Sequence, residues 1–165
     1  MPVELKGSCH CGTVKFTVQS STPVPYQVCL CSICRKVGGV GGSINLGAHA
    51  DTLQITEGKE HISIYNAVLN RGQANQSIAT SERHFCSKCS AMLWLWDETW
   101  PELLHPFASA IDSPELKDPE EMVICLLTNS KPDYVRLPGG KTKTYTGYPP
   151  LSIEEWHKEH GEYIP

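Results

Sequence analysis

No segment of the sequence is apolar over the length that a membrane-spanning helix requires, so we expect no membrane partner. The N-terminal residues MPVELKGSCHCG contain no apolar stretch followed by a small-residue cleavage site, which favours a soluble, intracellular protein of the cytoplasm. Basic residues are not in excess either, because 14 lysines and arginines stand against 18 aspartates and glutamates and give a formal charge of −4. With no basic stripe interleaved with aromatic residues, the sequence argues against nucleic-acid binding.

Repeats of fixed period, low-complexity tracts and an obvious linker are also absent. The 165 residues, of which 40% are apolar and 19% charged, suit one domain that buries a sizeable core. The tail from Lys131 is rich in proline, glycine and lysine and is the one candidate for loosely attached structure. We therefore expect a main domain over residues 1–130 and a C-terminal extension, 131–165, that packs on it or trails from it.

Short segments with alternating or β-branched residues recur along the chain and predict strands. Examples are TVKFTVQ, HISIYNA, AMLWLW and MVICLLT, with glycine, proline, asparagine and aspartate between them. Only two stretches favour a helix, SICRKVG and SIEEWHKEH, and in the second Ser152 is positioned to form a capping box with Glu155. The pattern predicts an all-β domain with one or two short helices.

What the sequence has in abundance is cysteine. Its eight cysteines fall as Cys9-x-Cys11, Cys29-x-Cys31-x-x-Cys34, Cys86-x-x-Cys89 and a lone Cys125. A secreted disulfide framework is the rival interpretation, but it lacks a signal peptide and usually occurs in a shorter chain. Closely spaced thiolates in a reducing compartment suit a metal, and zinc takes four of them tetrahedrally. Cys125 lies in the apolar run MVICLL and is interpreted as a buried thiol instead.

Seven clustered cysteines are too many for one zinc ion, and they divide into four and three. A closed set of four thiolates is typical of a structural zinc, whereas three protein ligands leave a position open for water or substrate. One division joins Cys9 and Cys11 to Cys86 and Cys89 and leaves Cys29, Cys31 and Cys34 as the open set. A second pairs Cys31 and Cys34 with Cys86 and Cys89 in a zinc ribbon. We favour the first, because three ligands within six residues can form an open site on one loop.

Three ordered motifs within residues 4–110 resemble those of the glutathione-dependent formaldehyde-activating enzyme family, to which centromere protein V also belongs: GSCHCG (7–12), CLCSICRK (29–36) and RHFCSKC (83–89). The resemblance implies a zinc-stabilised all-β fold of the Mss4-like type. It also implies two zinc ions per chain: a structural one held by Cys9, Cys11, Cys86 and Cys89, and a catalytic one held by Cys29, Cys31 and Cys34. Leu30 stands where many members have histidine, and Ser90 stands where glycine commonly follows the last cysteine, but neither change removes a ligand.

By the same resemblance, the expected activity is that of a carbon-sulfur lyase of the S-(hydroxymethyl)glutathione synthase type, which adds glutathione to formaldehyde or reverses that addition. A relative that acts on another thiol adduct or small metabolite, and a non-catalytic zinc-stabilised binding module, remain the alternatives. Candidate substrate-binding residues are Arg35 and Lys36, whose charges suit a carboxylate of glutathione, and Trp94 and Trp96, which alternate in a predicted strand and so share one face. Arg71 and Lys88 are further cations near the motifs.

Overall fold

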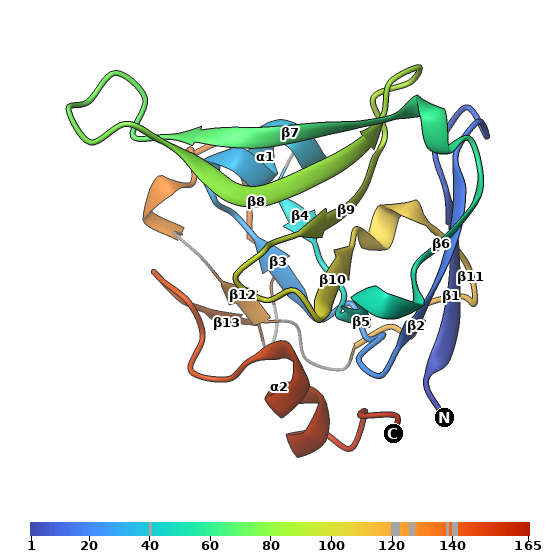
Figure 1. Ribbon diagram of the computed structural model, residues 1–165. Coiled ribbons are helices and arrows are strands. Elements are labelled where there is room, and N and C mark those ends of the chain that lie inside the picture. The colour runs from blue at the N-terminus through green and yellow to red at the C-terminus, as the bar shows by residue number, and fades with distance from the viewer. Residues whose placement is uncertain (40, 120–122, 126–127, 138, 140–141) are drawn as a thin grey trace.

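The computed structural model describes residues 1–39, 41–119, 128–137, 139 and 142–165, together with the backbone of 123–125. Within these residues the chain forms three β-sheets, two short α-helices and four 3-10 helices (Figure 1). The predicted all-β architecture with one or two short helices is therefore confirmed. No helix in the described part of the chain is long and apolar enough to cross a membrane.

Two antiparallel sheets enclose the main core (Figure 1). The first has the strand order β11-β1-β2-β6, with the bounds β1 Val3–Ser8, β2 Lys15–Ser20, β6 Gln54–Glu57 and β11 Ile111–Ser113. The second has the order β5-β10-β9-β8-β7, with the bounds β5 Ala48–His49, β7 Ile62–Leu69, β8 Ser77–Cys86, β9 Met92–Trp96 and β10 Leu103–Pro106.

The core follows from the alternation of apolar side chains along these strands. Phe16 and Val18 on β2 are each 1% exposed, and they belong to the same apolar cluster as Trp94 on β9 and Leu104 on β10. The rings of Phe16 and Trp94 meet edge to face, with 5.0 Å between their centroids. Burying such aromatic side chains stabilises a domain by roughly 1.5–3 kcal/mol each, so this contact is a main link between the two sheets.

The third sheet has the order β13-β12-β3-β4 and lies beside the first helix (Figure 1). Its bounds are β3 Gln27–Cys29, β4 Ser43–Ile44, β12 Val123–Cys125 and β13 Lys143–Thr144. Strand β12 runs parallel to both β3 and β13, and β3 pairs with β4 in the antiparallel sense. The backbone of Cys125 is thus in register with Cys29, while the buried thiol predicted for Cys125 lies outside the described side chains.

The helices are α1, Ser32–Gly38, and α2, Ile153–Glu159, and the 3-10 helices are Ala50–Thr52, Lys59–His61, Ala108–Ala110 and Thr128–Ser130. Helix α2 begins with the predicted capping box: the Glu155 amide donates to Ser152 Oγ at 3.2 Å, and the Ser152 amide donates to Glu155 Oε2 at 2.8 Å. These bonds satisfy two amides that the first turn would otherwise leave unpaired.

Helix α2 packs against the segment that leads into β3. The rings of Trp156 and Tyr26 stack at a centroid distance of 3.8 Å, and the Val24 amide donates to Nε2 of the buried His157 at 3.1 Å. The Ile164 amide donates to the Ser21 carbonyl at 3.0 Å. On these contacts we propose that residues 131–165 are an extension of the domain formed by residues 1–130.

Candidate metal centres

Two β-hairpins far apart in the sequence bring four cysteines together. Cys9 and Cys11 lie in the turn between β1 and β2, Cys86 is the last residue of β8, and Cys89 lies in the turn between β8 and β9. Their four sulfur atoms are all within 4.8 Å of one another, and the Sγ atoms of Cys11 and Cys86, 75 positions apart, are 3.8 Å apart. The structure therefore groups these thiols as the first of the two divisions does, and not as a ribbon with Cys31 and Cys34.

Local hydrogen bonds shape both turns of this four-cysteine group. The Gly12 amide donates to the Cys9 carbonyl at 2.9 Å, and the Ser90 amide donates to the Cys86 carbonyl at 2.8 Å. Ser90 has a φ of 62°, in the left-handed region that glycine adopts most freely. This conformation fits the glycine that commonly follows the last cysteine of the motif, and here a serine adopts it.

The seven cysteines whose side chains the structure describes are all free thiols. In the four-cysteine group, hydrogen bonds with the Thr13 side chain and backbone lower the pKa of Cys11 to about 6, whereas burial raises the pKa of Cys86 to about 11. Four free sulfurs that converge in this way match the ligand number of a structural zinc site. The residues present thus fit a closed tetrathiolate metal centre.

A second group of three cysteines lies where β3 passes into α1. Cys29 ends the strand, Cys31 is the N-cap of the helix, and Cys34 lies in its first turn. The Cys34 amide donates to Cys31 Sγ at 3.3 Å, so the helix start holds the Cys31 side chain in place. The three sulfurs lie within 4.8 Å of one another. Cys29 and Cys34 are buried and Cys31 is partly exposed, so this triad has its accessible side at Cys31.

Hydrogen bonds within the triad make its thiols unequal. Those from Cys29 and then Cys34 lower the pKa of Cys31 to about 2, and the bond with Cys31 raises the pKa of Cys29. The thiolate of the group is therefore most stable on Cys31, with the neighbouring thiols as donors. Three convergent sulfurs, of which Cys31 has a lowered pKa and is accessible, fit a metal ion whose fourth ligand is not supplied by the triad.

Residues 42 and 43 make close contacts with the backbone of the triad cysteines. Gly42 has a φ of 107°, and a Cβ atom at this position would lie 2.1 Å from the Cys29 carbonyl oxygen. Ser43 Oγ donates to the Cys34 carbonyl at 3.1 Å, which ties β4 to α1. Leu30 is 1% exposed, so the leucine that stands where many relatives have histidine packs inside the protein.

Of the predicted substrate-binding residues, Arg35 and Lys36 lie next to the triad on α1. The Arg35 guanidinium is held by backbone carbonyls, because Nε donates to Leu30 at 3.1 Å and Nη2 donates to Ser130 at 2.8 Å. It thereby joins the triad loop to the 3-10 helix at Thr128–Ser130. The Lys36 side chain is exposed.

Trp94 and Trp96 share one face of β9, as their alternation predicts, and both line a cavity whose lining includes none of the triad cysteines. The two further cations lie away from the triad cysteines in sequence. Arg71 is exposed in the turn between β7 and β8, and Lys88 is exposed in the turn of the four-cysteine group.

Sequence reasoning missed Arg83, which is 5% exposed. It pairs with Leu95 on β9, which in turn pairs with His105 on β10, so the three side chains lie on the face of the sheet opposite Trp94. Among the described residues, Arg83 donates from Nη1 to Ser81 Oγ at 3.2 Å, and its buried Nε has no partner.

Arg83 acts electrostatically on the triad. The pKa of the Cys34 thiol is raised to about 11. The hydrogen bond with Cys29 lowers this pKa, but the hydrogen bond with Cys31, burial and the charge of Cys31 raise it by more. The positive charge of Arg83 lowers the pKa of Cys34 and so offsets part of the increase. The sequence signal was an arginine three residues before Cys86, at the start of the motif RHFCSKC. Nothing in that pattern showed that this face of the strand is turned toward α1.

Comparisons with known proteins identify the family of the chain. The profile of the glutathione-dependent formaldehyde-activating enzyme family matches residues 4–125. A Halomonas elongata protein that carries the provisional name glutathione-dependent formaldehyde-activating enzyme is 50% identical over 159 residues, which cover 95% of this chain and 96% of the relative. A crystal structure of a Rhodobacter sphaeroides protein shares the fold, with a TM-score of 0.52 and 24% identity over 67% of this chain and 90% of the other. The chain belongs to the glutathione-dependent formaldehyde-activating enzyme family.

Proposed function

We propose that this protein is a zinc-dependent carbon-sulfur lyase of the cytoplasm that adds the thiol of glutathione to formaldehyde, or reverses that addition. The observation that carries the proposal is the presence of two separate thiol groups, one closed with four sulfurs and one with three sulfurs that is accessible at Cys31. Cys9, Cys11, Cys86 and Cys89 would hold a structural zinc, and Cys29, Cys31 and Cys34 would hold the catalytic one. The family relationship supports glutathione and formaldehyde as the substrates.

Zinc bound by the triad would favour a soft fourth ligand and lower the pKa of a thiol bound there, which keeps the sulfur nucleophilic at neutral pH. In the addition, the glutathione sulfur forms a bond to the formaldehyde carbon as the π bond of the carbonyl group breaks. The proton lost by the thiol balances the one gained by the new hydroxyl group, so no oxidant or reductant is required. The chain would position the substrate. Because Cys29 and Cys34 are buried, the substrate sulfur can approach the triad only from the side of Cys31.

Arg83 has a specific role in this proposal as a positioning residue. Three thiolates around a divalent ion leave a formal charge of −1, and a buried negative centre is costly unless a positive group lies nearby. Among the described residues, no carboxylate oxygen lies within 4.0 Å of the Arg83 nitrogens. Arg83 nevertheless acts on one buried carboxylate: burial raises the pKa of Asp97, but hydrogen bonds from Thr99 and Thr80 and the charge of Arg83 lower it. We infer that the charge of Arg83, which acts on both Asp97 and Cys34, stabilises the metal-loaded form of the triad.

Replacing Arg83 with methionine is expected to weaken zinc binding at the triad by about tenfold, equivalent to about 1.4 kcal/mol, because the compensating charge is removed. Arg83→Lys should recover most of the affinity, since it restores the charge without the fork of donors. The measurement is competition with a chromophoric chelator, with circular dichroism to verify folding. Arg71→Met, at the exposed turn between β7 and β8, is the matched control. Equal zinc affinity in Arg83→Met and the wild type would contradict the role.

The proposed activity is tested by NMR exchange spectroscopy on an equilibrium mixture of formaldehyde and glutathione. We expect the zinc-loaded protein to accelerate exchange between free and hydroxymethylated glutathione above the spontaneous rate. Cys34→Ser should abolish the acceleration, while Ser32→Ala, an exposed change in the same helix, should retain it. Acceleration with a different thiol alone would keep the chemistry and change the substrate. No effect of any small thiol would favour the zinc-stabilised binding module.

A further inference from the structure

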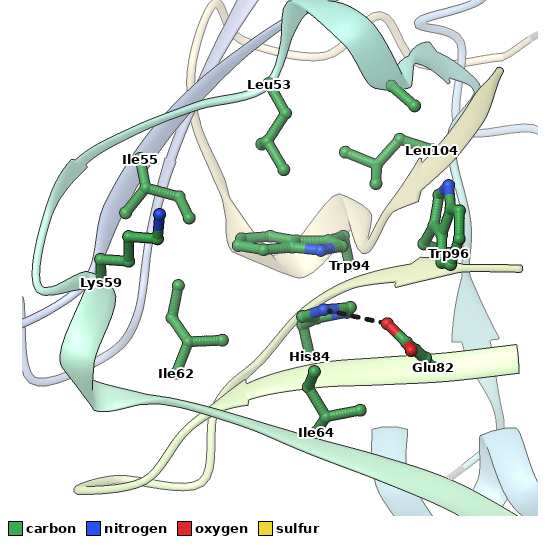
Figure 2. A pocket seen from close by; sticks show the side chains of 11 residues that line it. Leu53, Ile55, Lys59, Ile62, Ile64, Glu82, His84, Trp94, Trp96 and Leu104 are labelled. Carbon is green, nitrogen blue, oxygen red and sulfur yellow. Dashed lines mark ion pairs between the residues drawn. The ribbon is translucent and has the colours of Figure 1, made fainter. Parts of the chain in front are cut away.

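A cavity of about 410 Å³ lies on the Trp94 face of the second sheet, opposite the face that carries Arg83 (Figure 2). Its deepest residues, Trp94 and Leu104, are each 2% exposed and belong to the main core. The apolar side chains of Leu53, Ile55 and Ile62 also line the cavity and lie around the Trp94 ring in Figure 2. The volume is that of a small-molecule site, and it is too small for a folded partner segment.

The charged groups at this cavity differ in whether they are already paired. Glu82 is paired with His84 at 3.5 Å between Oε2 and Nε2, and the His84 ring stacks on Trp94 with 5.1 Å between centroids. Lys59, on the other side of the cavity in Figure 2, has no acidic partner within 4.0 Å in the described ranges. The positive charge of Lys59 and the carboxylate of Glu82 therefore lie on opposite sides of the cavity (Figure 2).

We propose that this cavity binds a small amphipathic anion, with its apolar body against Trp94 and Leu104 and its carboxylate or sulfonate group near Lys59. Burial of the apolar body supplies most of the affinity, because binding removes the apolar surface of both the ligand and the cavity walls from water. The lysine selects for negative charge, and Glu82 adds little repulsion because it lies on the opposite side of the cavity from Lys59. The inference does not depend on the proposed function, since no triad cysteine lines the cavity.

The test uses 2-naphthoate and its neutral isostere 2-naphthamide, titrated into the zinc-loaded full-length protein by isothermal calorimetry. We expect 2-naphthoate to bind with a stoichiometry of one and more tightly than the amide. Lys59→Met should weaken 2-naphthoate binding by about tenfold and leave the amide unchanged, as expected for loss of one charge contact in a partly dry site. Leu53→Trp should weaken both ligands by filling the cavity.

Two variants separate this site from the metal centre. Lys36→Met removes an exposed lysine beside the triad, and Cys31→Ser alters the triad itself, so both should bind 2-naphthoate as the wild type does. The proposal is overturned if 2-naphthoate shows no saturable binding, or if Lys59→Met binds it as tightly as the wild type. It is equally overturned if Lys36→Met or Cys31→Ser weakens binding while Leu53→Trp does not. Each of these results leaves the exchange experiment on glutathione unaffected.

Discussion

Cys89→Ser is expected to leave the chain largely unfolded or insoluble. Cys89 completes the four-sulfur group that joins the β1–β2 turn to the β8–β9 turn. Metal binding at such a site contributes directly to the free energy of folding, on the order of 10–16 kcal/mol for structural zinc, which matches or exceeds the net stability of a typical domain at about 5–15 kcal/mol. Losing one of four ligands therefore threatens the whole fold. Soluble yield, far-ultraviolet circular dichroism and thermal unfolding are the measurements.

The matched control is Cys31→Ser, which removes one sulfur from the triad with the same change of atom. Cys31 is the partly exposed N-cap of α1, and serine is also a good N-cap residue, so the helix start should persist. We expect this variant to fold with a melting temperature within a few degrees of the wild type and to lose only the triad metal. If Cys31→Ser unfolds and Cys89→Ser does not, the structural role belongs to the triad and the proposed assignment is wrong.

Mild chelation is expected to remove one equivalent of zinc, abolish the accelerated thiol exchange and leave the fold intact. The four-sulfur group offers no free ligand position to a chelator, whereas the triad supplies three ligands and is accessible at Cys31. A chelator can therefore bind the zinc ion while the triad still holds it, and then remove the ion. The four-sulfur group has no open ligand position at which a chelator could bind first. Elemental analysis before and after chelation, with circular dichroism on the same samples, measures both effects.

Zinc added back to the chelated protein should restore the exchange activity, which separates metal loss from irreversible thiol damage. A purified protein that contains one zinc ion per chain would contradict the division into two sites. So would a loss of β-sheet signal together with the first ion removed, because that would make the labile ion the structural one.

Much of the fold was predictable because local patterns and the structure agree. Alternation in TVKFTVQ and HISIYNA identified β2 and β7, and the Ser152–Glu155 capping box placed the start of α2. These signals depend on neighbouring residues alone. The parallel pairing of β12 with β3 carried no such signal, because it joins segments almost a hundred residues apart.

The candidate metal-ligating residues of the site were predictable because the intervals between cysteines are typical of metal ligands. Cysteine intervals separated a triad from two pairs, but spacing alone left both divisions open, and the structure brings Cys9 and Cys11 to Cys86 and Cys89. The sequence predicts Arg35 as a substrate-binding residue because its positive charge, next to the triad, suits a carboxylate group. Its bond to the Ser130 carbonyl, 95 positions away, is a tertiary contact that no local pattern contains. The same holds for Arg83, whose importance depends on which element faces it.

The two groups of cysteines also differ in the length of chain that must be closed to form them. The triad spans six residues, so an unfolded or nascent chain can offer its three sulfurs to a metal at almost no cost in loop entropy. The four-sulfur group requires the 75-residue separation between Cys11 and Cys86 to close first, and with it most of two sheets. During synthesis the triad would therefore be the first site able to capture a metal ion, while the four-sulfur group could bind one only as the long-range strand pairing completes. A metal bound early by the triad also stabilises the unfolded chain, which reduces the net stabilisation gained from that ion on folding.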